Sequence, residues 1–412
     1  MYTPVAGLTV NGLMASTSPL AMLALLDDPA LQWLVAQSFV RRKYALPEER
    51  LAHVGPRPGG PLRIGYLSGD LCTHAVGLLM PELLEAHDKS RVHVTAFDFS
   101  PEDGTSHRAR LKAACDDVVD IRAVDDRTAA LAIRDRHIDV LIDMHGLSSG
   151  ARPGILALRP ARSIGTYLGF IGTTALPWID FVVADRFTLP ESLAPFMTER
   201  PLYIDGSLIP LSHTPVPRTG LTRASVGLPD DAVVLACFNN IYKITPGVFA
   251  CWLRILRRVP QAVLWLLDDN TWATSALRHH AESAGIGADR LKFAGRSTHA
   301  EYRERLTLVD LYIDTFPYNA GSTARDVLDA GVPMVTLAGQ TMVSRMAGGL
   351  LHAAGFDQLI TTSVEAYETR IAQLASQPDA LEDLRRDLRT RAESWRAAPA
   401  RWMRSFEDAL LK

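Results

Sequence analysis

The chain has 412 residues, enough for about two domains with a substantial core in each. Hydrophobic residues make up 47% and charged residues 22%, which excludes a disordered or fibrous protein and indicates a soluble globular one. The 43 Lys and Arg against 46 Asp and Glu give a formal net charge of -3, so overall charge favours neither nucleic acid nor anionic lipid as a partner. An anionic ligand would therefore have to bind to positive or hydrogen-bond-donating groups gathered at one place in the protein.

Cysteine usage and hydropathy indicate a reducing compartment and no membrane span. The four cysteines, Cys72, Cys115, Cys237 and Cys251, lie far apart in apolar surroundings, without CxxC spacing. We therefore expect buried free thiols rather than disulfides or a metal site. The chain opens on no signal peptide and contains no apolar run long enough to cross a bilayer, so we expect a cytoplasmic protein without a membrane partner.

The first 60 residues predict a helical lead-in and a linker. Ser18-Pro19 caps a helix whose apolar residues precede a basic end at Arg41–Lys43, and Pro29 should break or kink this helix. The segment Pro56–Pro61 (PRPGGP) has the composition of a linker.

Residues 61–220 predict a parallel α/β domain. Short, mostly buried strands alternate with helical stretches, and this alternation implies a parallel sheet covered on both faces. The expected strands are Arg63–Ser68, Val92–Phe99, Val118–Ile121, Val140–Met144 and Phe181–Ala184.

Residues 221–412 repeat this pattern and predict a second domain of the same kind, closed by helices from about Pro378 onward. Two doubly wound domains place the carboxyl ends of two sheets opposite each other, with a cleft where a ligand could bind. The expected fold class is therefore α/β, with two Rossmann-like domains facing a central cleft. The expected strands are Val233–Phe238, Ala262–Leu267, Leu291–Phe293, Leu308–Ile313 and Met334–Leu337.

The stretch Asp314–Pro333 (DTFPYNAGSTARDVLDAGVP) is the most informative part of the chain. It predicts a strand end, a small-residue turn and a short helix that Ser322 and Thr323 could cap. Free backbone N–H groups, the positive end of the helix dipole and two hydroxyls suit an anionic ligand such as a diphosphate. The alternative is an ordinary helix held by a capping box between Thr323 and Asp326.

Two further turns follow expected strands. Lys243 lies just after the strand that ends at Phe238, where it could neutralise a departing diphosphate; a solvated loop lysine is the alternative. His74 follows the strand ending at Ser68 and could act as a general acid or base, or donate a hydrogen bond to a ligand. A capping or core histidine is the alternative there.

Two loops punctuated by glycine complete the set. Glycines in Tyr167–Thr174 could let the backbone approach a sugar closely, and Asp143–Gly154 predicts another strand-to-helix turn. Neither loop is diagnostic by itself.

The order and the amino-acid sequences of these motifs resemble the catalytic region of protein O-GlcNAc transferases, including their bacterial SPINDLY-type relatives. The resemblance implies a GT-B architecture with the nucleotide on the C-terminal half. It also implies inverting transfer of a sugar from a UDP-sugar to a protein side chain, with no metal and no cofactor beyond the UDP-sugar co-substrate. The matching segments, between about Arg63 and Ala375, are RIGYLSGD, GARPGILALRP, YLGFIGTT, FNNIYKITP, RVPQAVLWLL, DTFPYNAGST and AGVPMVTLAGQTMVSRMAG.

The resemblance implies a donor-binding role for five residues of the C-terminal half. Lys243 matches the lysine that neutralises the leaving UDP, and Asn240 takes the place of a glutamine that contacts the nucleotide. Ser322 and Thr323 match paired threonines at the diphosphate, and Asp326 matches the aspartate that binds the ribose.

In the first half, the resemblance implies that His74 is the active-site histidine and that Leu168 and Gly169 form the loop touching the sugar. Two departures affect the donor site. Tyr302 stands where the family usually has a histidine against uracil, and its ring can still stack on a base. Gly321 replaces a second histidine just before the paired hydroxyls and so removes one donor to the diphosphate.

The donor sugar and the acceptor stay open. Ile171 takes the place of a proline in the sugar loop, and Tyr318 that of a smaller residue near the N-acetyl group in some members. UDP-GlcNAc is the family default, and UDP-glucose or another UDP-hexose fits these residues too.

Family members usually carry tetratricopeptide helices before the catalytic region, and here Ser18–Tyr44 alone resembles a vestige of them. We therefore expect acceptor choice to come from the cleft, from this segment or from a partner. The function we expect is transfer of GlcNAc to Ser or Thr of protein substrates, without a nucleic-acid partner. The alternatives are a UDP-hexose transferase acting on asparagine or a small molecule, and a catalytically weak UDP-sugar-binding protein.

Overall fold

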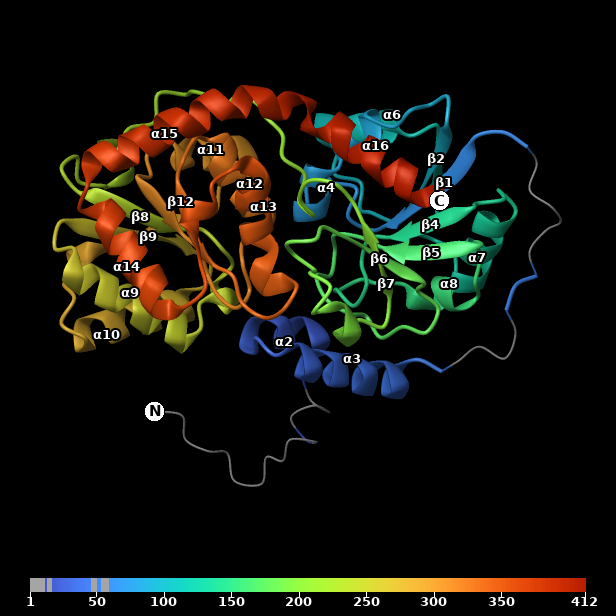
Figure 1. Cartoon of the computed structure of the whole chain (residues 1–412), viewed down its shortest axis with the longest axis horizontal. Coiled ribbons are helices and arrows are strands. Elements are labelled where there is room, and N and C mark those ends of the chain that lie inside the picture. Colours follow the sequence, from blue (N-terminus) through green and yellow to red (C-terminus); the bar gives the residue numbers. More distant parts are fainter. Residues whose placement is uncertain (1–11, 13–16, 46–49, 53–58) are drawn as a thin grey trace. The chain divides into compact units, whose positions relative to one another are not determined.

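The computed structural model describes residue 12 and residues 17–45, 50–52 and 59–412 (Figure 1). The chain divides into two compact units: unit 1 comprises residues 1–208 and 399–412, and unit 2 comprises residues 209–398. We expected a division at residue 220 and the last helix in the second domain, so both boundaries differ from the expectation. Of the expected linker, residues 56–58 lie outside the described residues.

Unit 1 is built on a parallel sheet of seven strands in the order β3-β2-β1-β4-β5-β6-β7. The central strand β1 pairs with β2 along its whole length and with β4 on its other side. Because both faces of these strands are buried, they are nearly continuous apolar runs. The strands are β1 (Leu62–Ser68), β2 (Val92–Asp98), β3 (Asp117–Asp120), β4 (Val140–Asp143), β5 (Ser163–Thr166), β6 (Phe181–Ala184) and β7 (Arg200–Tyr203).

Helices lie on both sides of this sheet (Figure 1). Pro29 breaks the lead-in helix as expected, since α2 ends at Leu25 and α3 starts with Pro29 at its first position, where a missing N–H does no harm. The helices are α2 (Pro19–Leu25), α3 (Pro29–Lys43), α4 (Ala75–Leu79), α5 (Pro81–Glu85), α6 (Ser106–Ala114), α7 (Asp126–Arg134), α8 (Pro153–Ala157) and α16 (Ala398–Leu410), with a short 3-10 turn η1 (Ala194–Phe196).

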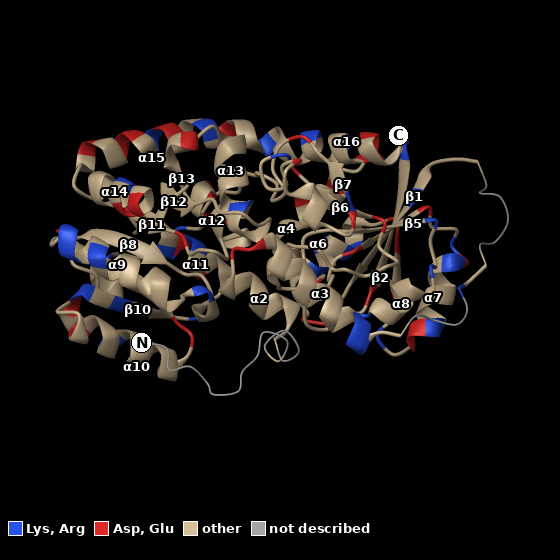
Figure 2. Cartoon of the chain, turned by 60° about the horizontal axis from the view of Figure 1, so that its bottom comes forward, with Lys and Arg blue, Asp and Glu red and all other residues tan. Residues whose placement is uncertain are grey.

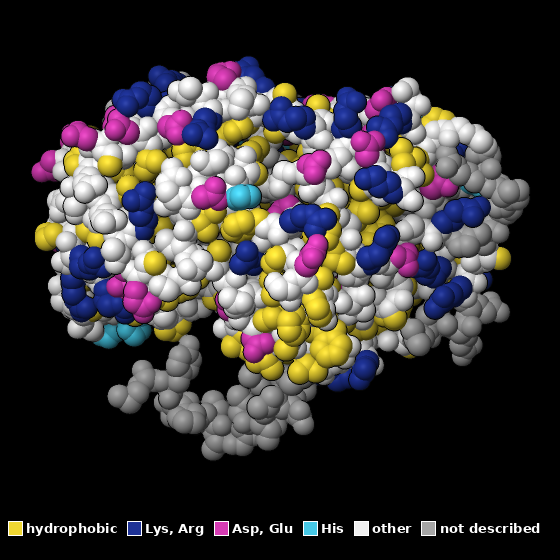
Figure 3. All heavy atoms as spheres, viewed as in Figure 1, with side chains coloured by type: hydrophobic (Ala, Val, Ile, Leu, Met, Phe, Trp, Pro, Cys, Tyr) yellow, Lys and Arg dark blue, Asp and Glu magenta, His cyan; other side chains and the backbone are white. Residues whose placement is uncertain are grey.

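The lead-in helices leave apolar side chains on the surface. Figure 3 shows hydrophobic side chains gathered over α2 and α3, where Leu25 and Leu34 are exposed. Their other faces are buried, with Leu23 and Val35 almost fully enclosed. These two helices therefore belong to the packed body of unit 1.

Unit 2 repeats the architecture with a six-stranded parallel sheet in the order β10-β9-β8-β11-β12-β13. Counted from its own first strand, this order is the same as that of the first six strands of unit 1. The strands are β8 (Val233–Cys237), β9 (Ala262–Asp268), β10 (Leu291–Gly295), β11 (Leu311–Ile313), β12 (Met334–Leu337) and β13 (Ile360–Thr361).

The helices of unit 2 include a long polar one near the C-terminal end. Figure 2 shows acidic and basic residues interspersed along α15, where Arg389 pairs with Glu382 and Arg391 with Asp387. The helices are α9 (Pro246–Arg258), α10 (Thr271–Ser283), α11 (His299–Leu306), α12 (Ser322–Asp329), α13 (Met346–Ala354), α14 (Val364–Ala375) and α15 (Pro378–Ala392). The 3-10 turns are η2 (Ala224–Val226), η3 (Ile241–Lys243), η4 (Ala288–Arg290), η5 (Val343–Arg345), η6 (Asp357–Leu359) and η7 (Glu393–Ala397).

Three strands escaped the sequence prediction because they are short and not uniformly apolar. β5 has four residues with a polar residue at each end, and β13 has only two residues. β7 contains Pro201, which an edge strand tolerates because one side of its backbone has no neighbouring strand to bond.

The strand order creates one equivalent position in each sheet. In unit 1 the order reverses direction between β1 and β4, and in unit 2 between β8 and β11. The connections after such strands leave in opposite directions, so the carboxyl ends of these strands open a crevice in doubly wound sheets. The candidate residues are therefore sought in the four loops that follow β1, β4, β8 and β11.

The state of the cysteines and the length of the helices can be compared with the expectations from the sequence. All four cysteines are free, with Cys72, Cys237 and Cys251 buried and Cys115 partly exposed. Burial raises the pKa of Cys237 to about 12, as suits an inert core thiol. Within the described ranges, no helix combines the length and the apolar character that a bilayer crossing requires.

The C-terminal helix α16 is anchored in unit 1 by a buried polar chain. Glu407 accepts hydrogen bonds from His87 Nδ1 at 2.8 Å and from the backbone N–H of Asp88 at 3.1 Å. His87 Nε2 lies 2.9 Å from the hydroxyl of Tyr66 on β1. Burial lowers the pKa of His87, so its neutral ring donates from Nδ1 and accepts from Tyr66 at Nε2.

Replacing Glu407 should loosen this anchor. We expect Glu407→Ala to lower the free energy of unfolding of unit 1 by about 1–3 kcal/mol, because the buried ring of His87 and the backbone N–H of Asp88 lose their acceptor. The matched control is Asp408→Ala, whose carboxylate is half exposed and pairs with Arg91 at the surface. Urea unfolding of both variants measures the effect, and equal midpoints for the two would contradict the role given to Glu407.

Candidate functional site

The loop after β11 in unit 2 is organised around a buried carboxylate. Asp314 follows β11 directly and has no exposed surface. Its Oδ1 accepts hydrogen bonds from Asn239 Nδ2 at 3.0 Å and from the backbone N–H groups of Thr315 and Ala320 at 2.8 and 2.9 Å. Its Oδ2 accepts from the hydroxyl of Thr336 at 2.7 Å. The carboxylate thus joins the ends of β8, β11 and β12.

Lys243 lies against this loop. Its Nζ donates to the carbonyl oxygen of Asn319 at 3.0 Å and sits 3.9 Å from the centre of the Tyr318 ring. Burial lowers its pKa to about 8, although the negative charge of Asp314 opposes that shift. The structure therefore brings the predicted lysine beside the turn that precedes α12, and the alternative of a solvated loop lysine is wrong.

The first turn of α12 carries no side-chain cap. The helix begins at Ser322, and its N-cap residue Gly321 makes no side-chain cap hydrogen bond. The capping box between Thr323 and Asp326, which was the alternative, is therefore not formed. Ser322 and Thr323 are half-buried members of the first turn rather than caps. Backbone N–H groups at such a helix start are suited to bind an anion.

Asp326 faces α11 instead of its own helix. Its Oδ2 lies 3.1 Å from His299 Nε2, and its Oδ1 lies 3.8 Å from Arg303 Nε. The rings of His299 and Tyr302 are stacked at a centroid distance of 6.1 Å, and Tyr302 also meets the edge of Phe238 at 6.0 Å. The structure therefore groups two aromatic rings and a carboxylate between α11 and α12.

Two features of this group bear on its chemistry. Burial raises the pKa of Tyr302 well above its ordinary value, so its hydroxyl keeps its proton. Asn240, which we also assigned to the nucleotide, is exposed after β8 and accepts a hydrogen bond from Arg296 at 3.4 Å. It lies at the open end of the loop that carries Lys243.

In unit 1, His74 serves as the N-cap of α4. Its Nδ1 accepts from the backbone N–H of Val76 at 3.3 Å and lies 3.4 Å from Asp70 Oδ2. The capping alternative is thus confirmed as a structural role. It uses only Nδ1 and leaves about half of the side chain exposed to solvent, so the ring stays accessible to a ligand.

His145, in the loop after β4, faces the same turn. Its Nε2 accepts from the backbone N–H of Gly69 at 2.8 Å and lies 3.6 Å from Asp70 Oδ2. Burial lowers its pKa, which agrees with a neutral ring whose Nε2 is an acceptor. The ring stacks on Phe99 at 5.3 Å. His74 and His145 therefore flank Asp70 at the reversal point of the unit 1 sheet.

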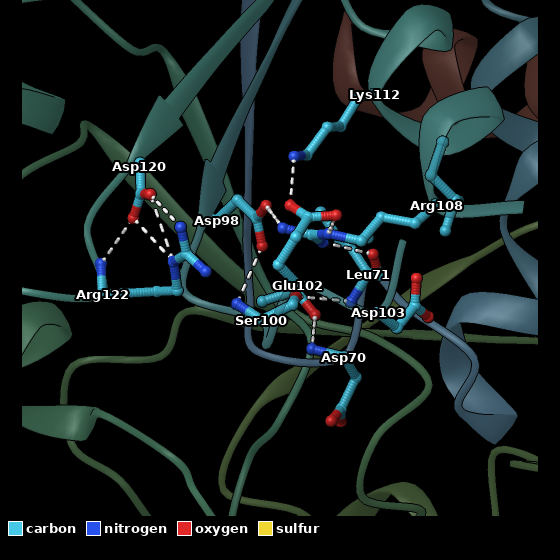
Figure 4. A network of polar contacts seen from close by, with 12 residues as sticks. Asp70, Leu71, Asp98, Ser100, Glu102, Asp103, Arg108, Lys112, Asp120 and Arg122 are labelled. Atoms are coloured by element: carbon cyan, nitrogen blue, oxygen red, sulfur yellow. Dashed lines mark hydrogen bonds and ion pairs between the residues drawn. The ribbon is translucent and has the colours of Figure 1, made fainter. Parts of the chain in front are cut away.

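A buried arginine is bonded to the turn that contains Asp70 and Leu71 (Figure 4). Arg108 donates to the carbonyl oxygen of Leu71 at 2.7 Å and to Asp98 Oδ2 at 2.8 Å. Ser100 Oγ accepts from the backbone N–H of Leu71 at 2.8 Å. Arg108 and Asp98 are both almost fully buried. Their ion pair therefore fixes the position of the loop that carries His74.

The sugar loop of the sequence analysis is also tightly packed. Leu168 adopts a left-handed backbone with φ 75°, and a Cβ on Gly169 would lie 1.9 Å from the carbonyl oxygen of Met144. Glycine is therefore required at 169 because the end of β4 passes close by. Further along the loop, buried Glu199 accepts hydrogen bonds from Thr173 Oγ1 at 2.8 Å and the Thr174 N–H at 2.7 Å.

No cluster of three or more His, Cys, Asp or Glu side chains suited to a metal ion occurs among the described residues. Lys243 and the backbone N–H groups are positive groups near the α12 start, and such groups can bind an anion.

The sequence falls within a known family. The model of glycosyl transferase family 41 matches residues 40–214 and 212–398. The chain belongs to glycosyl transferase family 41. The resemblance drawn from its motifs is thereby confirmed.

Two curated family relatives illustrate the similarity. A probable UDP-N-acetylglucosamine–peptide N-acetylglucosaminyltransferase SEC of Arabidopsis thaliana is 31% identical over 419 residues, which cover 97% of this chain and 43% of that protein. A probable transferase of the same kind, SPINDLY of Solanum lycopersicum, is 29% identical over 340 residues, which cover 81% and 36%. The chain spans less than half the length of these relatives.

Solved structures show the same fold. An O-GlcNAc transferase mutant of Thermobaculum terrenum superimposes with a TM-score of 0.86 at 28% identity, covering 95% of this family 41 chain and 76% of that one. The lipopolysaccharide galactosyltransferase WaaB, at a TM-score of 0.51 and 11% identity, shares the fold alone. The expected GT-B fold class, with two Rossmann-like sheets, is confirmed.

Sequence reasoning missed four residues that shape these loops: Asp314, His299, His145 and Glu199. Two of them had a usable signal. Asp314 is a carboxylate directly after a buried strand, and His299 lies three residues before Tyr302, on the same side of a helix. His145 and Glu199 gave no such signal, because their partners are distant in the sequence.

A second carboxylate at a strand end, that of Asp143, should make the stability of the protein depend on pH. Asp143 ends β4, is buried, and accepts from the backbone N–H groups of His145 and Gly146 at 3.3 and 2.7 Å. Burial raises its pKa to about 7. Because folding raises this pKa, protonated Asp143 stabilises the fold. This contribution to the free energy of unfolding is fully present below the pKa of the unfolded chain, near 4, and is lost as the pH rises through 7.

Asp143→Asn should remove this dependence. Relative to the wild type, the variant should gain up to about 1.4 kcal/mol of stability per pH unit between pH 5 and 7. Urea unfolding at several pH values measures the difference, with exposed Asp205→Asn as the control. A difference between variant and wild type that does not change with pH would contradict the prediction.

Proposed function

We propose that this chain is a UDP-sugar-dependent protein glycosyltransferase that transfers GlcNAc to Ser or Thr hydroxyls with inversion and without a metal ion. The observation that carries the proposal is the placement of Lys243 beside the uncapped start of α12, at the reversal point of the unit 2 sheet. Family membership and the names of the relatives support the donor and the acceptor class.

The proposed chemistry depends on stabilising a departing diphosphate. When the bond from the sugar to UDP breaks, negative charge grows on the β-phosphate. The N–H groups of the α12 start, the hydroxyls of Ser322 and Thr323 and the ammonium of Lys243 are positive groups fixed in advance around that position. Such fixed groups stabilise the transition state more than the bound donor, because the charge develops only there.

The nucleoside end of the donor would bind between α11 and α12. Asp326 would accept from the ribose hydroxyls, and Tyr302 would stack on the uracil base. His299, held 3.1 Å from Asp326, supplies an imidazole one helical turn before Tyr302, in a chain that lacks the family histidine at position 302. Asn240, at the exposed end of the β8 loop, would contact the nucleotide.

Unit 1 would supply the acceptor side. Inverting transfer is one displacement in which the acceptor hydroxyl attacks the anomeric carbon and loses its proton. His74 is the exposed titratable group of the β1 loop, and it would accept that proton or bind the acceptor by a hydrogen bond. Leu168 and Gly169 would shape the sugar pocket. We propose a cytoplasmic enzyme with protein or peptide acceptors and no nucleic-acid or membrane partner.

A panel of UDP-sugars tests the proposal. The protein is incubated with UDP-GlcNAc, UDP-glucose and other UDP-hexoses together with host-lysate proteins, and UDP release and acceptor mass shifts are measured. We expect a GlcNAc-sized shift on Ser or Thr. Transfer of hexose to asparagine or a small molecule would favour the first alternative, and UDP-sugar binding without transfer would favour a weak binding protein.

Removing the lysine should impair catalysis more than binding. Lys243→Ala should lower turnover by about two to three powers of ten and weaken UDP binding much less, because the leaving-group charge develops in the transition state. The control is Lys292→Ala on β10, outside the proposed site. Turnover close to that of the control would contradict the role given to Lys243.

Metal chelation should leave the enzyme active. The proposed positive groups at the diphosphate are backbone N–H groups and Lys243, which can replace Mg²⁺ electrostatically. We expect unchanged turnover in excess EDTA. Activity that disappears in EDTA and returns only with Mg²⁺ or Mn²⁺ would show that this account of charge neutralisation is wrong.

A further inference from the structure

The environment of Lys243 contains an aromatic pair that the proposed chemistry does not use. The ring of Tyr318 covers the ammonium at 3.9 Å, and the ring of Tyr242 lies 5.9 Å from that of Tyr318 at an interplanar angle of 36°. Tyr242 is half exposed, whereas Tyr318 is more enclosed. The ring of Tyr318 therefore contacts both the ammonium and the more exposed ring of Tyr242.

The two tyrosines come from opposite sides of the sheet reversal. Tyr242 lies in η3 after β8, next to Lys243 itself, and Tyr318 lies in the loop after β11. Asn319, the neighbour of Tyr318, accepts the hydrogen bond from the ammonium at 3.0 Å. Adjacent residues of one loop thus supply a carbonyl oxygen and an aromatic face to the same cation, which fixes its direction as well as its distance.

We propose that Tyr318 is the positioning residue of Lys243: its ring, in contact with that of Tyr242, holds the ammonium against Asn319 and screens it from water. The proposal rests on the proposed function. It gives Tyr318 a task at the leaving group, whereas the sequence analysis placed it near the donor's N-acetyl group.

The charged groups around Lys243 make the screening measurable. Asp314 is the neighbour whose negative charge favours the protonated form of Lys243, and the thiol of Cys237, with a pKa of about 12, is neutral. Burial outweighs the charge of Asp314 and lowers the pKa of Lys243 to about 8. Burial raises the pKa values of both Tyr242 and Tyr318, which favours the neutral form of both rings. The ring of Tyr318 has two opposite effects on the pKa of Lys243. By screening the ammonium from water it lowers the pKa, and by attracting the ammonium it raises the pKa.

The sizes of the two pKa shifts show which effect is larger. The fall from the ordinary value of 10.5 to about 8 exceeds two pH units, whereas a cation–π contact is equivalent to roughly one pH unit. Opening the site to water should therefore raise the pKa of Lys243. Replacing Tyr318 by phenylalanine keeps the ring and should leave it unchanged.

The test compares Tyr318→Ala and Tyr318→Phe in the full chain without nucleotide. Acetylation of Lys243 over about pH 6 to 11, read by peptide mass spectrometry, gives the midpoint at which the amine loses its proton. We expect a midpoint near 8 for the wild type and Tyr318→Phe, and one at least about one pH unit higher for Tyr318→Ala. Tyr203→Ala, which removes a ring from Arg186 in unit 1, is the matched control and should not move the midpoint.

Transfer kinetics form the second readout. Tyr318→Ala should lower kcat about tenfold, the equivalent of one lost cation–π contact, with a smaller change in KM, and Tyr318→Phe should restore it. Equal acetylation midpoints in wild type and Tyr318→Ala, or a Tyr318→Phe variant that behaves like Tyr318→Ala, would overturn the proposal. Because acetylation needs no nucleotide, its outcome stands even if the donor panel shows that the chain transfers no sugar.

Discussion

The loops at the strand ends of unit 2 depend on one buried carboxylate. Asp314 has no exposed surface, yet it accepts four hydrogen bonds that come from the ends of three parallel strands and from the turn before α12. Burial raises its pKa to about 6, and the hydrogen bonds and the charge of Lys243 oppose that rise. An ionised carboxylate so deep in a protein is tolerated only with such compensation. Asp314 therefore couples the fold to the ammonium, because the same charge that orders the loop favours the protonated lysine.

Both units apply the same topological rule with different residues. In each, the strand order reverses after the first strand, and polar side chains collect in the loops on either side of the reversal. Unit 2 places a lysine and an uncapped helix start there, which suit an anion. Unit 1 places a capping His74 and a buried neutral His145 around Asp70, which suit the binding of a hydroxyl or the movement of a proton. This difference in chemistry agrees with separate donor and acceptor roles.

Much of this arrangement could be predicted from the sequence, because strongly apolar strands and their following turns are local signals. Lys243 and the turn before α12 were located that way, as was the break at Pro29, whereas Ser322 and Thr323 were expected as caps and belong to the first turn of the helix. The rest depends on contacts between distant segments. The partner of Asp326 is His299, not Thr323, because α11 packs against α12. Gly169 faces the end of β4, so its small size serves packing. The short strand β7 and the attachment of α16 to unit 1 likewise reflect tertiary contacts that no local pattern records.

Hydrogen exchange with and without UDP tests the central claim most directly, since that claim concerns where the diphosphate binds. The account predicts that UDP slows exchange at the backbone N–H groups of residues 320–324 and in the loop around Lys243, and that Lys243→Ala weakens this protection. Saturating UDP that leaves exchange in both segments unchanged, or that protects other parts of the chain alone, would contradict it.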